Sequence, residues 1–429
     1  MMKALRTRFG FMNGNLRILT VRQVLGMFFR RMVLPYASLF ILAVGGDTAQ
    51  VGFVNSLRPL AGLLMFPISG YLTDRTGRVK LIVLAGYLRA LTMLLYVFTP
   101  NWEWIALGAL VQGFMVFQFP PTSAILADNI DPRSRGVGIA TMNTLATALS
   151  MFSPYIAGII LEFHGNNHGM RILYAMFVVA QVINATLVLK FLRETSAIEK
   201  TGTRLNVLTM LKEAYAGIPE LISKMSRSVK ALGLLFGMGS IANGIAGPFW
   251  VVYATEVIGL SNIDWGLILL LESIFKTILT IPCGVIADRY SRTKTLFAAV
   301  LFSLVSLPSL ILAKNFTHVL LIRLGAGLAG ALFTPSSTAL MADSVPRDLR
   351  GRVMAAMGRG SILVGAAGGG TGGPGMGYLF TVPVMIASVV GGLLYSMNPS
   401  YPWIGILGTA IIQLISIILF IRDPEKVEK

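Results

Sequence analysis

The sequence predicts an all-helical integral membrane protein with twelve transmembrane helices, arranged as two six-helix bundles related by a pseudo-two-fold axis. Three observations support this prediction. Hydrophobic residues make up 55% of the chain and charged residues only 13%, which is more apolar surface than a soluble domain needs. Apolar runs long enough to cross a bilayer recur along the chain. A charged motif at residues 70–80 recurs in the second half at residues 284–294.

The two copies of this motif share a glycine, an aspartate, two arginines and a lysine, at an offset of 214 residues in a chain of 429. An apolar sequence rarely repeats a pattern of charges over such a distance, so we interpret the two halves as copies of one unit. The shared residues are Gly70, Asp74, Arg75, Arg78 and Lys80 in the first copy, and Gly284, Asp288, Arg289, Arg292 and Lys294 in the second.

Each half is predicted to contain six spans, because each holds six apolar runs of roughly 20 residues or more. The predicted spans are 19–45, 51–72, 80–99, 103–127, 136–162 and 170–192, then 230–258, 264–287, 294–313, 317–342, 352–397 and 402–421. The predicted domains are therefore two bundles, 1–192 and 230–429, joined by a polar cytoplasmic linker, 193–229. Apolar residues at helical spacing in this linker predict an amphipathic helix on the membrane surface.

The distribution of charge predicts the orientation of the chain. Most of the 36 Lys and Arg residues lie in the tails and in loops on one side of the predicted spans. The positive-inside rule therefore places both termini in the cytoplasm and the protein in the cytoplasmic membrane. This topology explains the net charge of +17 without a nucleic-acid partner. The single cysteine, Cys283, excludes a disulfide framework and a cysteine metal site.

The eleventh span is irregular, because residues 365–377 hold eight glycines in thirteen positions. Glycine is a poor helix former, and this insertion has no counterpart in the first half. A broken helix, a re-entrant turn or a cytoplasmic loop would each fit the pattern.

The repeated motif and the six-plus-six pattern of spans resemble the major facilitator superfamily of transporters. The stretch at residues 70–80 is similar to that family's signature between the second and third helices, and the second copy resembles its usual weaker echo. The resemblance covers nearly the whole chain. It implies alternating access between two bundles, with no catalytic residues, no cofactor and no metal.

Two departures from the family pattern concern proton coupling. The basic residue that the family often carries in its fourth helix has no counterpart, since Ala109 and Gln112 occupy that region. The fifth-helix pattern associated with antiporters is reduced to Ser153, Pro154, Ala157 and Gly158. Both departures weaken a prediction of proton-driven antiport.

The repeated charges predict a cytoplasmic gate. Asp74, at a helix end, can accept hydrogen bonds from the free N–H groups that open a helix in the opposite half. Arg78 can pair with Asp128 at the foot of the fourth helix. The full predicted gate is Gly70, Asp74, Arg75, Arg78, Lys80, Asp128, Gly284, Asp288, Arg289, Arg292 and Asp343. This gate is expected to hold the cytoplasmic side shut and to break when the cavity faces inward. The alternative is that these charges only set topology.

Ionisable residues inside apolar spans are costly, so each one indicates a functional position. Six deep cations (Arg30, Arg31, Arg58, Arg89, Lys276 and Arg323) accompany a single deep acid, Glu272. This excess predicts a cavity for an anionic substrate, because arginine matches the geometry of carboxylate and phosphate. The predicted cavity residues are Arg30, Arg31, Asn55, Arg58, Arg89, Ser240, Asn243, Glu272, Lys276 and Arg323. The alternative is that several of these arginines bond to backbone carbonyls or water. Arg22 lies near a span end and is not assigned to the cavity.

Glu272 is the one acid available for proton coupling. Its expected partner is Lys276, four residues later on the same helix, or Arg58 from the other half.

The predicted function is secondary transport of a small organic anion or amphiphile, by a monomer in the lipid bilayer, with protons as a candidate coupling ion. The alternatives are a proton-coupled multidrug or cation efflux pump that uses Glu272, and a non-transporting sensor on the same fold. An intramembrane protease is excluded, because no span carries a Ser–His pair or a His-Glu-x-x-His pattern.

Overall fold

The computed structural model describes residues 14–130, 135–195, 211–212, 215–345, 347–358 and 377–423. Within these ranges the chain forms helices and no β-strand. The predicted glycine-rich insertion lies outside the described residues except for Gly377.

The first half contains the helices of one bundle. They are α2 (Asn15–Val33), η1 (Leu34–Tyr36), α3 (Ala37–Ala43), α4 (Thr48–Thr76), α5 (Arg78–Val97), α6 (Trp102–Phe114), η2 (Met115–Gln118), α7 (Phe119–Asn129), α8 (Arg135–Ser150) and α9 (Ser153–Phe191). The described part of the central linker holds the short helix α11 (Ile218–Lys224).

The second half contains the helices of the other bundle. They are α12 (Arg227–Ala246), η3 (Gly247–Phe249), α13 (Trp250–Val252), η4 (Tyr253–Val257), α14 (Asn262–Arg289), α15 (Arg292–Ser306), η5 (Pro308–Leu312), α16 (Phe316–Ser344), α17 (Arg347–Met357), η6 (Tyr378–Phe380), α18 (Thr381–Met397) and α19 (Tyr401–Phe420).

Ten of the described helical stretches are long and apolar enough to cross a membrane. One of these, residues 136–191, turns at Gly165, which has a φ of 71°. Glycine adopts a positive φ with little strain because it has no Cβ atom. After that turn Gly169 packs back against Leu161, so α9 contains two antiparallel helices. The 29-residue helix α4 lies outside the ten stretches. The chain is thus an all-helical, multi-pass membrane protein, and the count of twelve crossings stays a prediction.

The eleventh predicted span, 352–397, is not one helix among the described residues, in line with the break expected at its glycine-rich stretch. The structure gives α17 and α18 instead, and only the stretch Tyr378–Met397 is long and apolar enough to cross a membrane. The other predicted span limits lie within a few residues of the observed helix ends.

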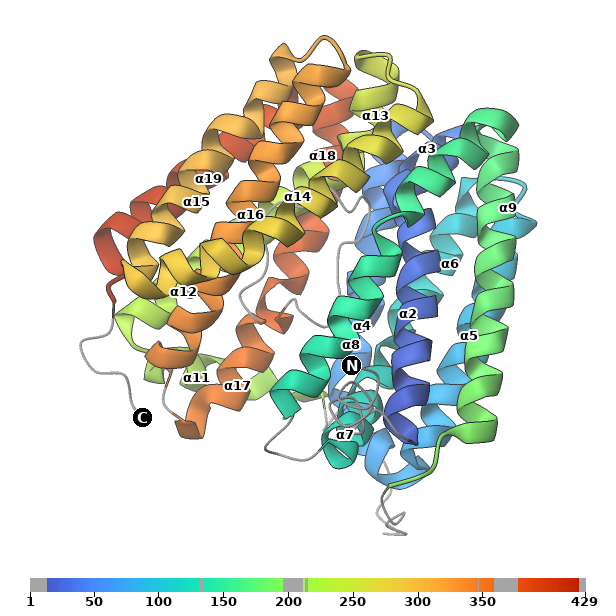
Figure 1. Cartoon of the computed structure of the whole chain (residues 1–429), viewed down its shortest axis with the longest axis horizontal. Coiled ribbons are helices and arrows are strands. Elements are labelled where there is room, and N and C mark those ends of the chain that lie inside the picture. The colour runs from blue at the N-terminus through green and yellow to red at the C-terminus, as the bar shows by residue number, and fades with distance from the viewer. Residues whose placement is uncertain are drawn as a thin grey trace, which may run out of the picture.

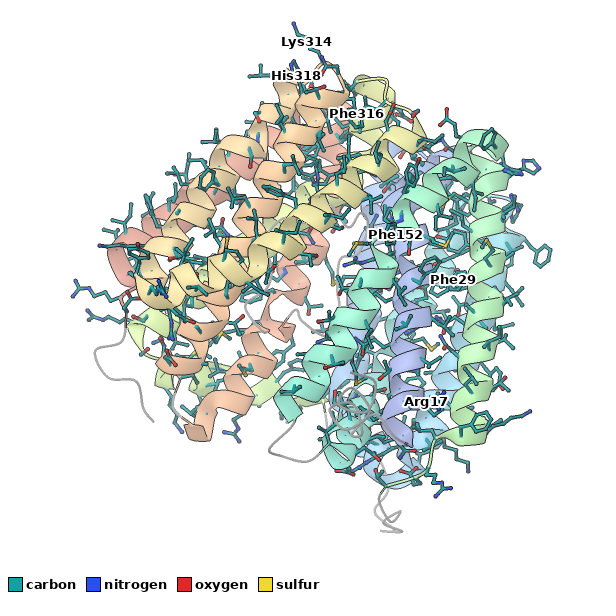
Figure 2. The ribbon with its side chains drawn as sticks, in the orientation of Figure 1. Arg17, Phe29, Phe152, Lys314, Phe316 and His318 are labelled. Atoms are coloured by element: carbon teal, nitrogen blue, oxygen red, sulfur yellow. The ribbon has the colours of Figure 1, made fainter. Side chains whose placement is uncertain are left out.

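Figure 1 shows α2 to α9 as one group of helices and α12 to α19 as a second group beside it. We call the end of the molecule that holds Arg17 the terminal end, and the end that holds Lys314 and His318 the distal end (Figure 2). The two groups meet near the distal end, where α3 and α13 lie, and diverge toward the terminal end (Figure 1).

The distal contact between the bundles is made by close backbone approaches. α14 packs against α9, and α18 packs against α4. A Cβ atom on Gly158 would lie 2.3 Å from the carbonyl oxygen of Asn262, and one on Gly52 would lie 2.4 Å from that of Ser388. The hydroxyl of Tyr36 lies 2.8 Å from the carbonyl oxygen of Pro154 and 3.1 Å from that of Asn262. Small residues therefore let the helices of the two halves touch at this end.

One residue of the central linker joins both bundles. The hydroxyl of Tyr215 donates to the carbonyl of Leu63 in α4 at 2.6 Å, and its ring packs edge-on against Tyr378 of η6. Leu63 is four residues before Pro67, which has no N–H to complete the helical hydrogen bond. Burial, with the neighbouring Tyr378 adding to it, raises the pKa of Tyr215 to about 12. The linker thus satisfies a carbonyl that proline leaves free.

We expect Gly158→Ala to disfavour the distal contact, because the new methyl would overlap the Asn262 carbonyl. Spin labels at Phe163 and Leu312, both exposed, would report the distal separation after Cys283 is replaced by serine. The distance distribution is expected to shift to longer values. Gly408→Ala is the matched control, because a Cβ there meets no atom within 4 Å. An unchanged distribution in Gly158→Ala would contradict the role of this contact.

Candidate functional site

Two interrupted helices shape the interior of the N-terminal bundle. Pro35 ends α2 and begins η1, which leaves Arg30 and Arg31 in the last turn of α2. Positive side chains are stabilised at a helix C-terminus, where the backbone carbonyls lack helical donors. In the fourth span the helix tightens to the 3-10 segment η2 before α7, which places Gln118 inside the bundle. Such interruptions occur where transporters bind their ligands.

The site is a cavity with two adjoining parts, which we call the arginine cavity. Its larger part, of about 590 Å³, is the amide end, lined by Arg22, Arg30, Arg31, Arg89, Gln23, Gln118, Thr122, Gln181 and Asn184 among others. Its smaller part, of about 170 Å³, is the aromatic end, lined by Arg30, Arg58, Arg89, Met93, Tyr96, Gln112, Phe119, Tyr174 and Phe177 among others. Arg30 and Arg89 line both parts. Of the described residues of the C-terminal bundle, Thr381 alone lines either part.

Among the described residues, the lining of the arginine cavity includes five arginines and no aspartate or glutamate. Arg22 donates to the side-chain oxygen of Gln118 and Arg58 to that of Gln112, each at 2.9 Å. Arg89 lies close enough to Arg22, Arg30 and Arg58 to be repelled by all three. Arg30 is exposed and the other four are half-buried, so these guanidinium groups can reach the cavity space, where the described lining places no carboxylate beside them.

The buried acid of the C-terminal bundle has a different partner from those predicted. Glu272 pairs with Arg323 of α16, whose Nε donates at 3.0 Å, rather than with Lys276 or Arg58. Arg323, which was expected in the outer part of its span, has a side chain that is fully buried within the protein. Its guanidinium lies 4.5 Å from the ring centre of Trp250 and 5.9 Å from that of Trp265.

The remaining predicted cavity residues lie elsewhere. Ser240, Asn243, Glu272, Lys276 and Arg323 do not line either part of the arginine cavity. Lys276 is exposed and packs against Gly330. Its charged neighbours are Glu272, Arg31 and Arg323. Asn55 donates to the carbonyl of Val51 and lines a small neighbouring cavity that Arg58 also borders. The described lining of the arginine cavity therefore comes mainly from the N-terminal half, and a substrate site between the halves stays a prediction.

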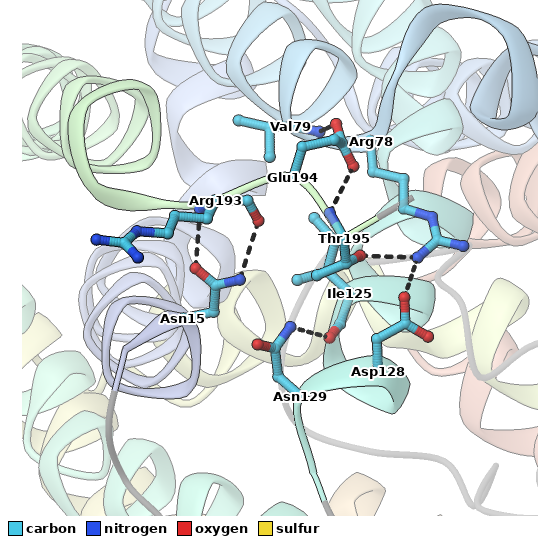
Figure 3. Close-up of polar contacts among 9 residues, drawn as sticks. All are labelled: Asn15, Arg78, Val79, Ile125, Asp128, Asn129, Arg193, Glu194 and Thr195. Carbon is cyan, nitrogen blue, oxygen red and sulfur yellow. Dashed lines mark hydrogen bonds and ion pairs between the residues drawn. The ribbon is translucent and has the colours of Figure 1, made fainter. Parts of the chain in front are cut away.

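The first copy of the charged motif forms a cluster at the terminal end (Figure 3). Arg78 pairs with Asp128 of α7 and also donates to the hydroxyl of Thr195 at 2.9 Å. The backbone N–H of Val79, in the first turn of α5, donates to Glu194 at 3.0 Å. Glu194 thus supplies an acceptor to a helix start whose N-cap residue, Gly77, has no side chain to accept a hydrogen bond.

The second copy repeats this arrangement. Arg292 pairs with Asp343 and lies 3.7 Å from Asp288. The N–H of Thr293, 214 residues after Val79, donates to Asp423 at 3.0 Å. Burial opposes ionisation of Asp423, but hydrogen bonds from Ser291 and Thr293, with Arg292 nearby, outweigh it and lower the pKa of Asp423. A carboxylate just after the last helix of each bundle therefore caps the third helix of that bundle.

The other predicted gate residues are less informative. Gly70, Asp74 and Arg75 belong to the last turns of α4, and the side chains of Asp74 and Arg75 lie outside the described residues. Lys80 and Arg289 are exposed. Gly284 was expected to allow a close helix approach, but a Cβ there would lie 4.0 Å from Pro335, an ordinary contact. The described gate pairs join residues within one bundle.

Sequence reasoning missed several residues of the arginine cavity. Arg22 was set aside as close to a span end, and Gln118, Gln181 and Asn184 were not considered. A usable signal was present, because Gln181 and Asn184 are polar residues three apart in an apolar span. Counting amides as well as charges would have found them.

Comparisons with known proteins agree with the fold. The chain is 24% identical over 333 residues to the multi-drug resistance efflux pump PmrA homolog of Lactococcus lactis, covering 76% of this chain and 78% of that protein. It is 23% identical over 333 residues to the multidrug resistance protein MdtG of Salmonella paratyphi B, covering 75% and 78%.

Among solved structures, the nucleoside transporter NupG superposes with a TM-score of 0.66 at 14% identity, covering 95% of this chain and 98% of that one. A bacterial homolog of the human lysosomal transporter Spinster, inward-facing and unoccupied, superposes with a TM-score of 0.65 at 14% identity, covering 94% and 96%. The sequence profile of the Major Facilitator Superfamily matches residues 19–239 and 232–429. These matches extend over nearly the whole chain, and the protein belongs to the Major Facilitator Superfamily of membrane transporters, which are not enzymes.

Proposed function

We propose that this transporter carries a small organic anion or anionic amphiphile across the cytoplasmic membrane by alternating access, with both termini in the cytoplasm. One observation carries the proposal. In the part of the chain that the structure describes, five arginines line the arginine cavity, and no carboxylate does. An anion would supply the missing counter-charge, and arginine is the side chain best suited to hold it without losing its own proton.

The aromatic end of the cavity supports an amphiphilic substrate. Phe119, Tyr174 and Phe177 offer apolar ring surface beside Arg30 and Arg89. Aromatic walls bind apolar bodies of varied shape. The relatives named as multidrug efflux proteins make export of such compounds the preferred direction.

Alternating access would use the two ends of the molecule in turn. With the termini in the cytoplasm, the present arrangement is closed outside and open inside, so the cytoplasmic gate would be released here. The pairs Arg78–Asp128 and Arg292–Asp343 join residues of the same bundle, which fits a released gate. In the opposite state Asp74 would engage the facing bundle while the contacts of Gly158 and Gly52 separate.

A proton-coupled pump for cations is the alternative function. Glu272 is the candidate coupling group, but it pairs with Arg323 and does not line the arginine cavity. A cationic substrate would also meet five like charges there. We therefore rank cation efflux second, and we propose that the working unit is a monomer.

A charge-matched ligand panel tests the substrate class. The anion 1-naphthoate is expected to raise the melting temperature of the purified protein, because a ligand that binds only the folded state stabilises it. The cation tetraphenylphosphonium is expected to have no effect. Arg58→Gln should reduce the shift with naphthoate. Stabilisation by the cation alone would overturn the proposal. Binding without flux in proteoliposomes would identify a sensor instead.

We expect Glu272→Gln to lower the stability of the C-terminal bundle by about 3–5 kcal/mol, since it leaves a buried arginine without its counter-charge. The double variant Glu272→Gln with Arg323→Met should recover much of this loss, as measured by thermal unfolding in detergent. Flux driven by a pH gradient checks coupling in the same variants. If the gradient still drives transport in Glu272→Gln, this residue is not the coupling group.

Asp74→Asn is expected to cut transport while leaving expression and melting temperature near those of the parent protein. The amide cannot offer the negative charge that a helix N-terminus attracts, so the gated state would be populated less. Glu103→Gln, at an exposed distal position, is the matched control. Normal flux in Asp74→Asn would show that the motif only sets topology.

A further inference from the structure

The amide end of the arginine cavity contains polar groups that have no partner among the described residues. Gln181 and Asn184 are 5% and 3% exposed, lie one turn apart on α9 and face the cavity. The side-chain oxygen of Asn184 accepts no hydrogen bond in the described part of the chain. Buried amides almost always find partners, so these two groups indicate a ligand that completes the site.

The arginines beside these amides have no anionic partner among the described lining residues. Arg30 lines the cavity from α2 and Arg89 lines it from α5. Arg22 also lines it from α2, nearer the N-terminus of that helix than Arg30. Arg22 has Gln118 as a neutral partner, and the lining residues that the structure describes offer Arg30 and Arg89 no acid. Arg89 is repelled by both of the other two. Three guanidinium groups therefore converge with no anion to hold them together.

We infer that the amide end binds a doubly charged tetrahedral oxyanion head, of the phosphate monoester or phosphonate class, whose apolar body lies in the aromatic end. This inference rests on the proposed function and names the substrate class within it. The head would accept hydrogen bonds from Arg22, Arg30 and Arg89. Gln181 and Asn184 would complete its remaining hydrogen bonds.

The number of oxygens favours this head over a carboxylate. A carboxylate offers two oxygens in one plane and satisfies one arginine fork. A phosphate monoester offers three terminal oxygens and up to two charges at pH 7, so it can accept from arginines that approach from two helices. The side-chain NH2 groups of Gln181 and Asn184 can each donate to an oxygen of this head. The larger volume of the amide end, about 590 Å³, leaves room for the hydrated head.

The aromatic end fixes the orientation of the ligand. Arg30 and Arg89 stand at the junction of the two ends, so the charged head and the apolar body must meet beside them. Beyond this junction Met93, Phe119 and Phe177 form apolar walls. A compound with a single aromatic ring attached directly to its head matches this division.

The experiment compares three ligands that share a phenyl ring, using calorimetric titration of the purified full-length protein. The ligands are phenyl phosphate, benzoate and benzyltrimethylammonium. At pH 7.5 phenyl phosphate is expected to bind at least about tenfold more tightly than benzoate, because it carries a second charge and a third oxygen. At pH 5 this preference should shrink, since the ester then carries one charge.

Variants show which side chains cause the preference for phenyl phosphate over benzoate. Gln181→Met and Asn184→Leu keep the side-chain bulk and the net charge, so they should reduce the phosphate preference while benzoate affinity changes less than about twofold. Arg58→Gln, at the aromatic end, should weaken both anions alike and keep the preference. Melting temperatures of the unliganded variants show whether each one folds.

The outcomes separate this inference from the proposed function. Equal affinity for phenyl phosphate and benzoate would overturn the head-group assignment and leave an anion transporter. An unchanged preference in both amide variants, if these fold, would place the head elsewhere and also overturn the inference. Binding of benzyltrimethylammonium alone, or of none of the three, would overturn both.

Discussion

The cost of burying positive charge in a bilayer governs the organisation of this transporter. Each guanidinium in a membrane span must find an anion, a set of acceptors or water. The two bundles meet this requirement differently. Arg323 is neutralised within the C-terminal bundle by Glu272 and by the faces of Trp250 and Trp265. In the N-terminal bundle Arg30 and Arg89 line a cavity whose described lining includes no acid.

This difference gives the two bundles separate roles. The neutralised pair in the C-terminal bundle is a packed element of its core, and it leaves few charges to recognise a ligand. The arginines of the N-terminal bundle are held by neutral amides such as Gln112 and Gln118, which orient them without cancelling their charge. The described arginines that line the cavity thus belong to the N-terminal bundle.

The two ends of the molecule are held together by different kinds of contact. The distal end is joined by backbone contacts at Gly52 and Gly158, which need no charges and depend only on the absence of side chains. The terminal end carries ion pairs and carboxylate caps inside each bundle, such as Arg78–Asp128 and Asp423 on Thr293. A contact that depends on shape and one that depends on charge respond to different substitutions, so the contributions of the two ends can be separated experimentally.

The sequence by itself determined the all-helical membrane fold and the positions of the charges within the spans, because these follow from local hydropathy. It also determined the repeat, because the charged motif occurs in both halves of the chain. It also predicted an excess of cations, which the lining of the arginine cavity retains. Only the tertiary structure decided which charges meet. Glu272 pairs with Arg323, 51 residues away, rather than with the neighbouring Lys276, because the packing of α14 against α16 brings those side chains together. It likewise decided that Arg22, Gln181 and Asn184 face one cavity, since helical spacing gives the face of each helix but not the face of its neighbour.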